Sequence, residues 1–218
     1  MNLFITPHYK AHEMVIKCCE NLDKNAKLPF FHIVVDDNSP NGLPDIKITE
    51  NRILLSVKSD VDPNLHTMNM GTCMDMALDY ARKNLKFDHF FHLESDVMPK
   101  KNFDADMLEI ASGLFNWGTL DLQSVDENGA TTYPDTINHR IEAADEEDKL
   151  DILPHTDFQC TLFNPEVMSV FNYTDVASHY DILISNIIFD KTGRFHYRTR
   201  KVQAIHYAGT SREMLPKL

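Results

Sequence analysis

Two carboxylates stand two residues apart where an apolar run ends, in residues 89–99, HFFHLESDVMP. The run predicts a buried strand over His89–Leu93, and Glu94 and Asp96 follow it directly. Residues i and i+2 of extended backbone point to the same side, so both carboxylates can face one cation. Mg²⁺ and Mn²⁺ prefer such oxygen ligands. The alternative is a turn without a ligand, because acid–x–acid triplets are common.

A second acidic pair, Asp36 and Asp37, follows another apolar run in residues 34–40, VVDDNSP. A carboxylate only accepts hydrogen bonds, so one of these acids could accept donors from a nucleobase or a ribose. The alternative is a turn that the side chains of Asp and Asn close. The segment alone favours neither interpretation.

Two later segments carry further candidates. His206 follows the apolar end of residues 202–212, VQAIHYAGTSR, and a neutral imidazole there could be an additional metal ligand. Ser211 and Arg212 offer a hydroxyl and a guanidinium suited to phosphate. The alternative is a half-buried histidine before a flexible tail. Asp181, at the start of an expected helix, could be a general base or only a partner of the helix dipole.

Alternating strands and helices are expected to position these residues. The sequence predicts a strand over residues 2–6 that Pro7 ends. It also predicts that residues 97–99, which end in proline, close the preceding strand, because proline has no N–H to donate to a sheet hydrogen bond. Residues 126–154 read as a loop-rich insertion. The remaining strands are expected at 30–35, 52–57, 120–125, 158–163 and 195–207, and helices at 13–22, 68–83, 103–115, 165–171 and 179–189.

This order predicts an α/β sheet with helices on both faces, in which ligands bind beyond the carboxyl ends of the strands. Three polar clusters fall at such ends: Thr6-Pro7, Asp36-Asp37 and Glu94-Ser95-Asp96. That coincidence predicts one composite site.

Composition excludes several classes of protein. The 218 residues suit one domain, and the net charge of −12 disfavours general binding to nucleic acid or anionic lipid. No apolar run is long enough to span a bilayer, and the first residues lack a signal-peptide pattern, so a cytoplasmic protein is expected. The four cysteines form no CxxC pair and are expected to be reduced. GxGxxG, GxxxxGK[ST] and GxSxG motifs do not occur in the sequence.

Taken in order, these segments resemble the GT-A glycosyltransferases, in particular the family-two group. Thr6, Pro7 and Tyr9 look like the first strand and substrate loop, and Val34–Ser39 looks like the VVDDxS element whose second acid, here Asp37, contacts uracil. Asn69 begins a segment similar to NxG, and Glu94-Ser95-Asp96 stands at the DxD metal motif, with Ser95 or Glu94 near ribose or a metal-bound water. Asp181 stands at the position of the base, and His206 belongs to a late HxxGxS-like element.

The resemblance implies one GT-A domain over residues 1–218, with a nucleotide-binding half at 1–100 and an acceptor-side half at 101–218. Family members commonly continue beyond this point, so the resemblance is also consistent with one module of a longer polypeptide. It implies Mn²⁺- or Mg²⁺-dependent transfer of a hexose or deoxyhexose from a UDP-sugar to a carbohydrate or other hydroxyl acceptor, with inversion. Three residues depart from the family pattern: Glu94 replaces the first aspartate of DxD, Tyr180 replaces a glutamate, and Leu183 replaces a second acid. The alternatives are a nucleotidyltransferase that makes sugar nucleotides and a non-catalytic nucleotide- or carbohydrate-binding module.

Overall fold

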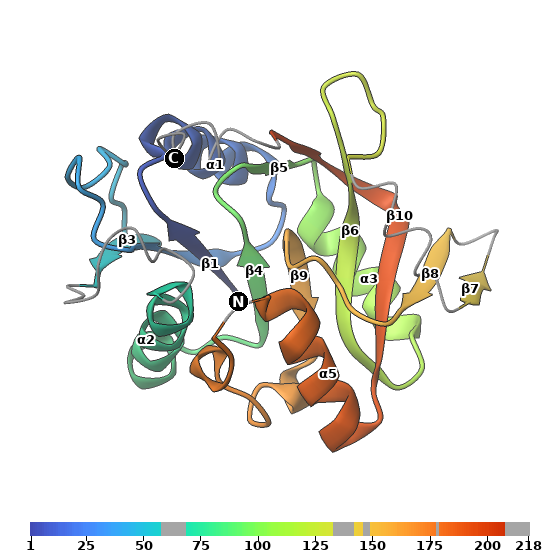
Figure 1. Cartoon of the computed structure of the whole chain (residues 1–218). Helices are drawn as coiled ribbons and strands as arrows, with labels where there is room; N and C mark the ends of the chain where they lie inside the picture. The colour runs from blue at the N-terminus through green and yellow to red at the C-terminus, as the bar shows by residue number, and fades with distance from the viewer. Residues whose placement is uncertain (58–68, 133–141, 146–148, 178, 208–218) are drawn as a thin grey trace, which may run out of the picture.

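The computed structural model describes residues 1–57, 69–132, 142–145, 149–177 and 179–207. Within these ranges ten strands form one mixed sheet in the order β3-β2-β1-β4-β9-β6-β10-β8-β7, and β5 pairs with β10 outside that row (Figure 1). The strands are β1 (Asn2–His8), β2 (Phe30–Asp36), β3 (Arg52–Ser56), β4 (His89–Leu93), β5 (Val97–Pro99), β6 (Trp117–Val125), β7 (Glu142–Asp145), β8 (Leu150–Leu153), β9 (Cys160–Phe163) and β10 (Phe195–His206).

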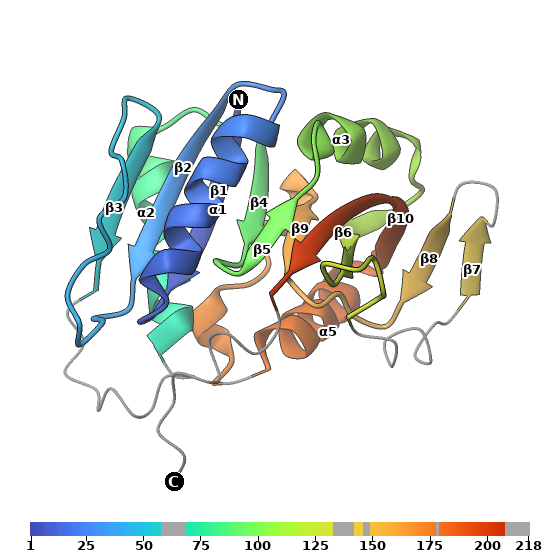
Figure 2. The same cartoon turned by 90° about the horizontal axis from the view of Figure 1, so that it is seen from above.

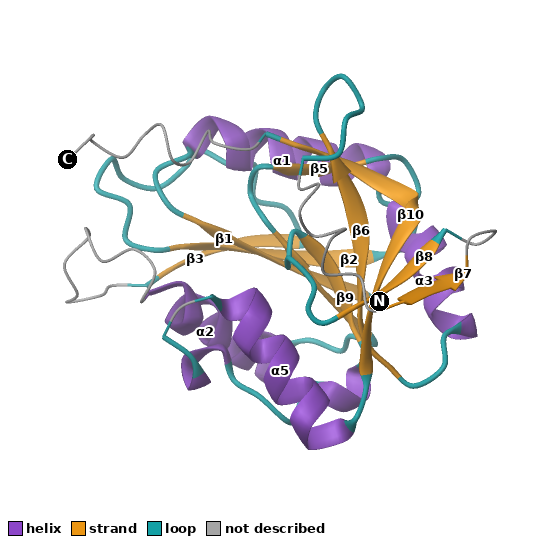
Figure 3. Ribbon diagram, turned by 45° about the vertical axis from the view of Figure 1, so that its right-hand side comes forward, coloured by secondary structure: helices purple, strands orange, loops and turns teal. Residues whose placement is uncertain are grey.

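Helices cover both faces of the sheet (Figure 3). On one face lie α1 (His12–Asn25) and α3 (Phe103–Gly113), and on the other lie α2 (Asn69–Asn84) and α5 (Tyr180–Thr192). Two 3₁₀ turns, η2 (Pro165–Val167) and η3 (Tyr173–Asp175), precede α5. None of the described helices combines the length and the apolar composition that crossing a bilayer requires. This layered α/β arrangement confirms the predicted fold class.

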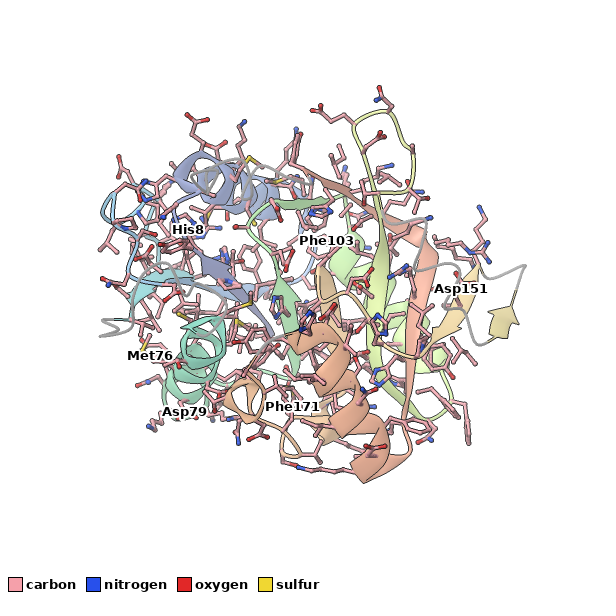
Figure 4. The ribbon with its side chains drawn as sticks, viewed as in Figure 1. His8, Met76, Asp79, Phe103, Asp151 and Phe171 are labelled. Carbon is pink, nitrogen blue, oxygen red and sulfur yellow. The ribbon has the colours of Figure 1, made fainter. Side chains whose placement is uncertain are left out.

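The two faces have separate apolar cores. On the α1 and α3 side, Phe103 packs its ring against Phe4 and Phe91, with centroids 5.7 and 6.3 Å apart. On the α2 and α5 side, Phe171 packs against Phe163 at 5.7 Å (Figure 4 labels Phe103 and Phe171). The alternation of strand side chains between the faces supplies both cores from one sheet. All four cysteines are buried and unpaired, as expected.

The parallel half of the sheet sets the place of the site. β1 pairs in parallel with β2 on one side and with β4 on the other. The chain order therefore reverses at β1, which makes its carboxyl end a topological switch point (Figure 2). Ligands of open α/β sheets bind in the crevice at such a point.

The expectation that Pro7 ends the first strand is wrong. β1 continues through Pro7 to His8, and Pro7 faces Val35 in the register with β2. The carbonyl of His8 accepts from Asp37 N on the β2 side, so the backbone of Pro7 points to the other side. Pairing with β4 has already ended at Ile5 there, and the missing N–H of proline costs no sheet hydrogen bond.

Two further expectations are corrected. Residues 97–99 do not leave the sheet but form β5, which pairs antiparallel with β10; Pro99 is tolerated because this short strand has one paired edge. The stretch 126–154 is not only loop: β8 pairs with β10 and carries β7 at the edge of the sheet. Of the predicted helix over 165–171, the structure has only the 3₁₀ turn η2.

Candidate nucleotide and metal site

A pocket of ≈ 130 Å³ opens beyond the carboxyl ends of β1, β2 and β4. It therefore lies at the switch point of the sheet. Its lining comes from the end of β1 and the β1–α1 turn, the residue after β2, the first turns of α2 and the β4–β5 turn. The lining residues are Pro7, His8, Tyr9, Ala11, Asp37, Met70, Cys73, Glu94, Ser95 and Asp96.

Glu94, Asp96 and His206 bring their ligand atoms together at one edge of this pocket. One carboxylate oxygen of each acid and one ring nitrogen of His206 all lie within 4.8 Å of one another. His206 Nε2 is 3.6 Å from Asp96 Oδ2. The pairing of β5 with β10 places them there, because His206 faces Val97 in the register and Tyr207 N donates to the carbonyl of Asp96.

The charge around this cluster is strongly negative. Burial raises the pKa of Glu94 well above its usual range, and the charges of Asp96 and Asp181 add to that rise, followed by those of Asp121 and Asp157. A bound cation stabilises the ionised form of carboxylates that raise one another's pKa in this way. Two carboxylates and an imidazole are a donor set that Mn²⁺ accepts, and Mg²⁺ through the oxygens. The residues therefore fit a divalent cation.

The two neighbouring acids after β2 have different surroundings. Asp36 closes the turn, because its carboxylate accepts from Ser39 N at 3.0 Å and from Ser39 Oγ at 2.5 Å. Asp37 lines the pocket, is 5% exposed and lies against the thiol of Cys73, whose pKa is raised by burial and by Asp37. The turn interpretation thus describes Asp36, and only Asp37 is placed to meet a ligand in the pocket.

The other candidates for nucleotide binding divide in the same way. Pro7, Tyr9 and Ser95 line the pocket. Thr6 does not: it is fully buried, and its hydroxyl is 2.9 Å from His32 Nε2. The predicted contact of the Thr6 side chain with a nucleotide therefore has no support in the geometry.

Three candidates are only partly or not at all within the described residues. Asn69 is the first residue of α2, and the structure describes only its backbone. Ser211 and Arg212 lie outside them entirely.

Asp181 is the second residue of α5, two residues after the N-cap His179, which has a left-handed φ of 50°. Its carboxylate forms a second cluster with His155 and Asp157, whose ligand atoms lie within 4.8 Å of one another. The charge of Asp181 contributes to the raised pKa of Glu94, so the two clusters are close enough to interact electrostatically.

Several residues near the pocket and the two clusters were not predicted from the sequence. Arg198, on β10, ion-pairs with Asp157 at 2.5 Å, and Asp157 N donates to Asp121 on β6. His8, at the end of β1, is 2% exposed, and burial lowers the pKa of its ring to about 4. The polar residues at alternate positions of β6 and β10 were the available hint, but the register between those strands is not visible in the sequence.

Solved structures with the same fold match 94% of this chain. TarS of S. aureus superposes with a TM-score of 0.66 at 14% identity, over 36% of its own length. The mannosyltransferase PcManGT from Pyrobaculum calidifontis, solved with GDP-Man and Mn²⁺, gives 0.65 at 14% identity over 56% of its length. GalNAc-T7, solved with UDP, GalNAc and Mn²⁺, gives 0.62 at 10% identity over 43% of its length.

This chain thus spans less than two thirds of the length of each of these proteins. Neither a protein-family model nor a curated protein matches the sequence. The likeness at these identities concerns the fold: the chain has the GT-A fold of nucleotide-sugar glycosyltransferases.

Proposed function

We propose that this protein is a metal-dependent glycosyltransferase that moves a hexose or deoxyhexose from a UDP-sugar to a hydroxyl of a glycan or other acceptor. One observation carries the proposal. On a GT-A sheet, the Glu94, Asp96 and His206 cluster shares a pocket edge with Asp37, at the switch point where nucleotides bind.

Each residue then has a chemical task. Glu94, Asp96 and His206 would hold Mn²⁺ or Mg²⁺, which when bound offsets the charge on the departing nucleoside diphosphate. Asp37 accepts an N–H of the nucleobase, and Tyr9 and Ser95 border the same pocket. Asp181 accepts the proton of the attacking hydroxyl, which is the task that an inverting transfer assigns to a base.

The donor nucleotide is the first thing to measure. A carboxylate such as Asp37 accepts equally from the N–H of uracil or of guanine, and the structural neighbours include complexes with UDP and with GDP-Man. Calorimetric titration of UDP and GDP, with Mn²⁺ and with EDTA, separates the two. We expect binding of UDP that requires Mn²⁺; failure of both nucleotides to bind in Mn²⁺ would overturn the proposal.

Asp96→Asn tests the metal cluster directly. The substitution keeps the shape of the side chain and removes its charge, so we expect Mn²⁺-dependent UDP affinity to fall by at least about tenfold, the scale of one charged contact. Asp106→Asn on the exposed side of α3 is the matched control and should bind as the wild type does.

Turnover separates the remaining functions. Release of UDP from a panel of UDP-sugars identifies the sugar and shows catalysis. Pyrophosphate released from UTP and a sugar phosphate would instead identify a nucleotidyltransferase. Binding without release of UDP from any donor would leave a non-catalytic module.

A further inference from the structure

The first turn of α2 is held by the tyrosine that precedes the candidate base. Gly71 is the third residue of α2, and the first N–H groups of a helix have no acceptor within the helix. Tyr180, the first residue of α5, supplies one: its hydroxyl oxygen accepts from Gly71 N at 3.2 Å, and the contact is buried. A side chain of α5 thus caps the start of α2.

The backbone of η3 and the ring of Tyr180 lie so close to α2 at Gly71 that a side chain there would force a shift. A Cβ at position 71 would lie 2.9 Å from the carbonyl oxygen of Tyr173 and 3.1 Å from Cε1 of Tyr180. One turn further along α2, the carboxylate of Asp75 accepts from Tyr173 N and Thr174 N at 2.8 and 2.9 Å. The start of α2 is therefore fixed to η3 and α5 by polar contacts as well as by packing.

The same turn of α2 forms a wall of the nucleotide pocket. Met70 and Cys73 line the pocket, and Cys73 lies against Asp37. The hydroxyl of Tyr180 is close enough to this wall that the charge of Asp37 adds to the rise in its pKa, of which burial is the main cause. The side chain of Tyr180 thus connects the pocket wall to the start of α5, next to Asp181.

We infer that Tyr180 is a positioning residue that joins the nucleotide pocket to the candidate base, by holding the first turn of α2 against the first turn of α5. This inference rests on the proposed function. It also gives a role to a position where the GT-A resemblance has an acid: this chain uses a neutral hydroxyl there to dock α2.

Tyr180→Phe removes the hydroxyl and keeps the ring. Tyr197→Phe is a matched control. Tyr197, on β10, is also buried, and its hydroxyl donates a hydrogen bond to the backbone oxygen of Phe115 at 3.0 Å. We expect both variants to lose similar thermal stability. Only Tyr180→Phe should weaken Mn²⁺-dependent UDP binding, by about three- to tenfold, and speed amide exchange at Gly71.

The outcomes separate this inference from the function on which it rests. Equal UDP affinity in Tyr180→Phe and the wild type, with the wild type binding normally, overturns the inference alone. A wild type that binds neither UDP nor GDP in Mn²⁺ overturns both the proposed function and the positioning role of Tyr180. Exchange at Gly71 that does not change in Tyr180→Phe overturns the capping contact itself, whatever the nucleotide result.

Discussion

Neighbouring acids in this cleft differ in what their oxygens already accept, and that difference decides what they can do. Asp36 and Asp37 are adjacent in sequence, yet Ser39 occupies both carboxylate oxygens of Asp36 with hydrogen bonds. Asp37 instead borders the pocket beside Cys73. A carboxylate that closes a turn is structural, whereas one at a pocket wall can exchange partners with a ligand. The same residue type therefore has two roles one position apart.

Asp181→Asn tests the assignment of the base. Asparagine cannot take the proton of the attacking hydroxyl, so we expect transfer to fall by about 10²–10⁴-fold while UDP affinity in Mn²⁺ changes little. Asp190→Asn, an exposed acid on the same helix α5, is the control and should keep full activity. Transfer that persists in Asp181→Asn would remove this residue from the mechanism and move attention to Asp157.

The sequence grouped Asp37, Asp96 and His206 at one site, and the structure brings the three to one pocket and its metal-ligand edge. Strand ends were enough for that grouping, because acids after consecutive parallel strands meet at one edge of a sheet. Asp121, Asp157 and Arg198 were missed because their meeting depends on the register of β6 with β10 and on the segment before β9. Side-chain periodicity does not contain that information.

At the scale of elements, long apolar runs were readable and short pairings were not. β4 and the helices α1, α2, α3 and α5 follow directly from their patterns. β5 has three residues and ends in proline, so nothing local marks it as a strand; tertiary pairing with β10 makes it one. That pairing is also what brings His206 to Asp96, so the least readable strand is the one that completes the candidate metal cluster.

Asp104 joins three elements and offers a test of stability apart from function. It is fully buried in the first turn of α3 and accepts from Lys27 N at 2.8 Å, Leu28 N at 2.9 Å and Asn2 Nδ2 at 3.3 Å. Asp104→Ala leaves these donors without their acceptor, so we expect the free energy of unfolding to fall by about 2–4 kcal/mol.

Urea unfolding measures that loss, and Asp104→Asn, which keeps one acceptor, should lose less. Asp106→Ala in the same turn is exposed and should change stability by less than about 0.5 kcal/mol. Mn²⁺-dependent UDP affinity should stay normal in all three variants. An Asp104→Ala protein as stable as the wild type would show that these hydrogen bonds do not contribute to stability.

At the scale of the whole molecule, a chain with a net charge of −12 brings buried and half-buried carboxylates from distant segments close enough to raise the pKa of Glu94 together. Glu94, Asp121, Asp157 and Asp181 come from four different parts of the chain, and Arg198 ion-pairs with Asp157 among them. Such an arrangement costs stability in the absence of a cation, because like charges destabilise one another in a poorly hydrated place. The fold thus holds its acids in a form that a bound cation stabilises.

Asp121 makes that cost measurable. Burial raises its pKa to about 7 and Arg198 offsets only part of the rise, so between the unfolded value near 3.9 and about 7 the folded state binds the extra proton. Stability must therefore fall as the pH rises through this window. Asn at position 121 carries no charge to bury, so the stability of Asp121→Asn relative to the wild type should be about 2 kcal/mol more favourable at pH 8 than at pH 5.5. Urea unfolding in EDTA at the two pH values gives this difference, in which any constant packing effect of the substitution cancels. The exposed control Asp106→Asn should have the same stability relative to the wild type at both pH values. If Asp121→Asn also showed no difference between pH 5.5 and pH 8, Asp121 would be ionised in the folded protein at both.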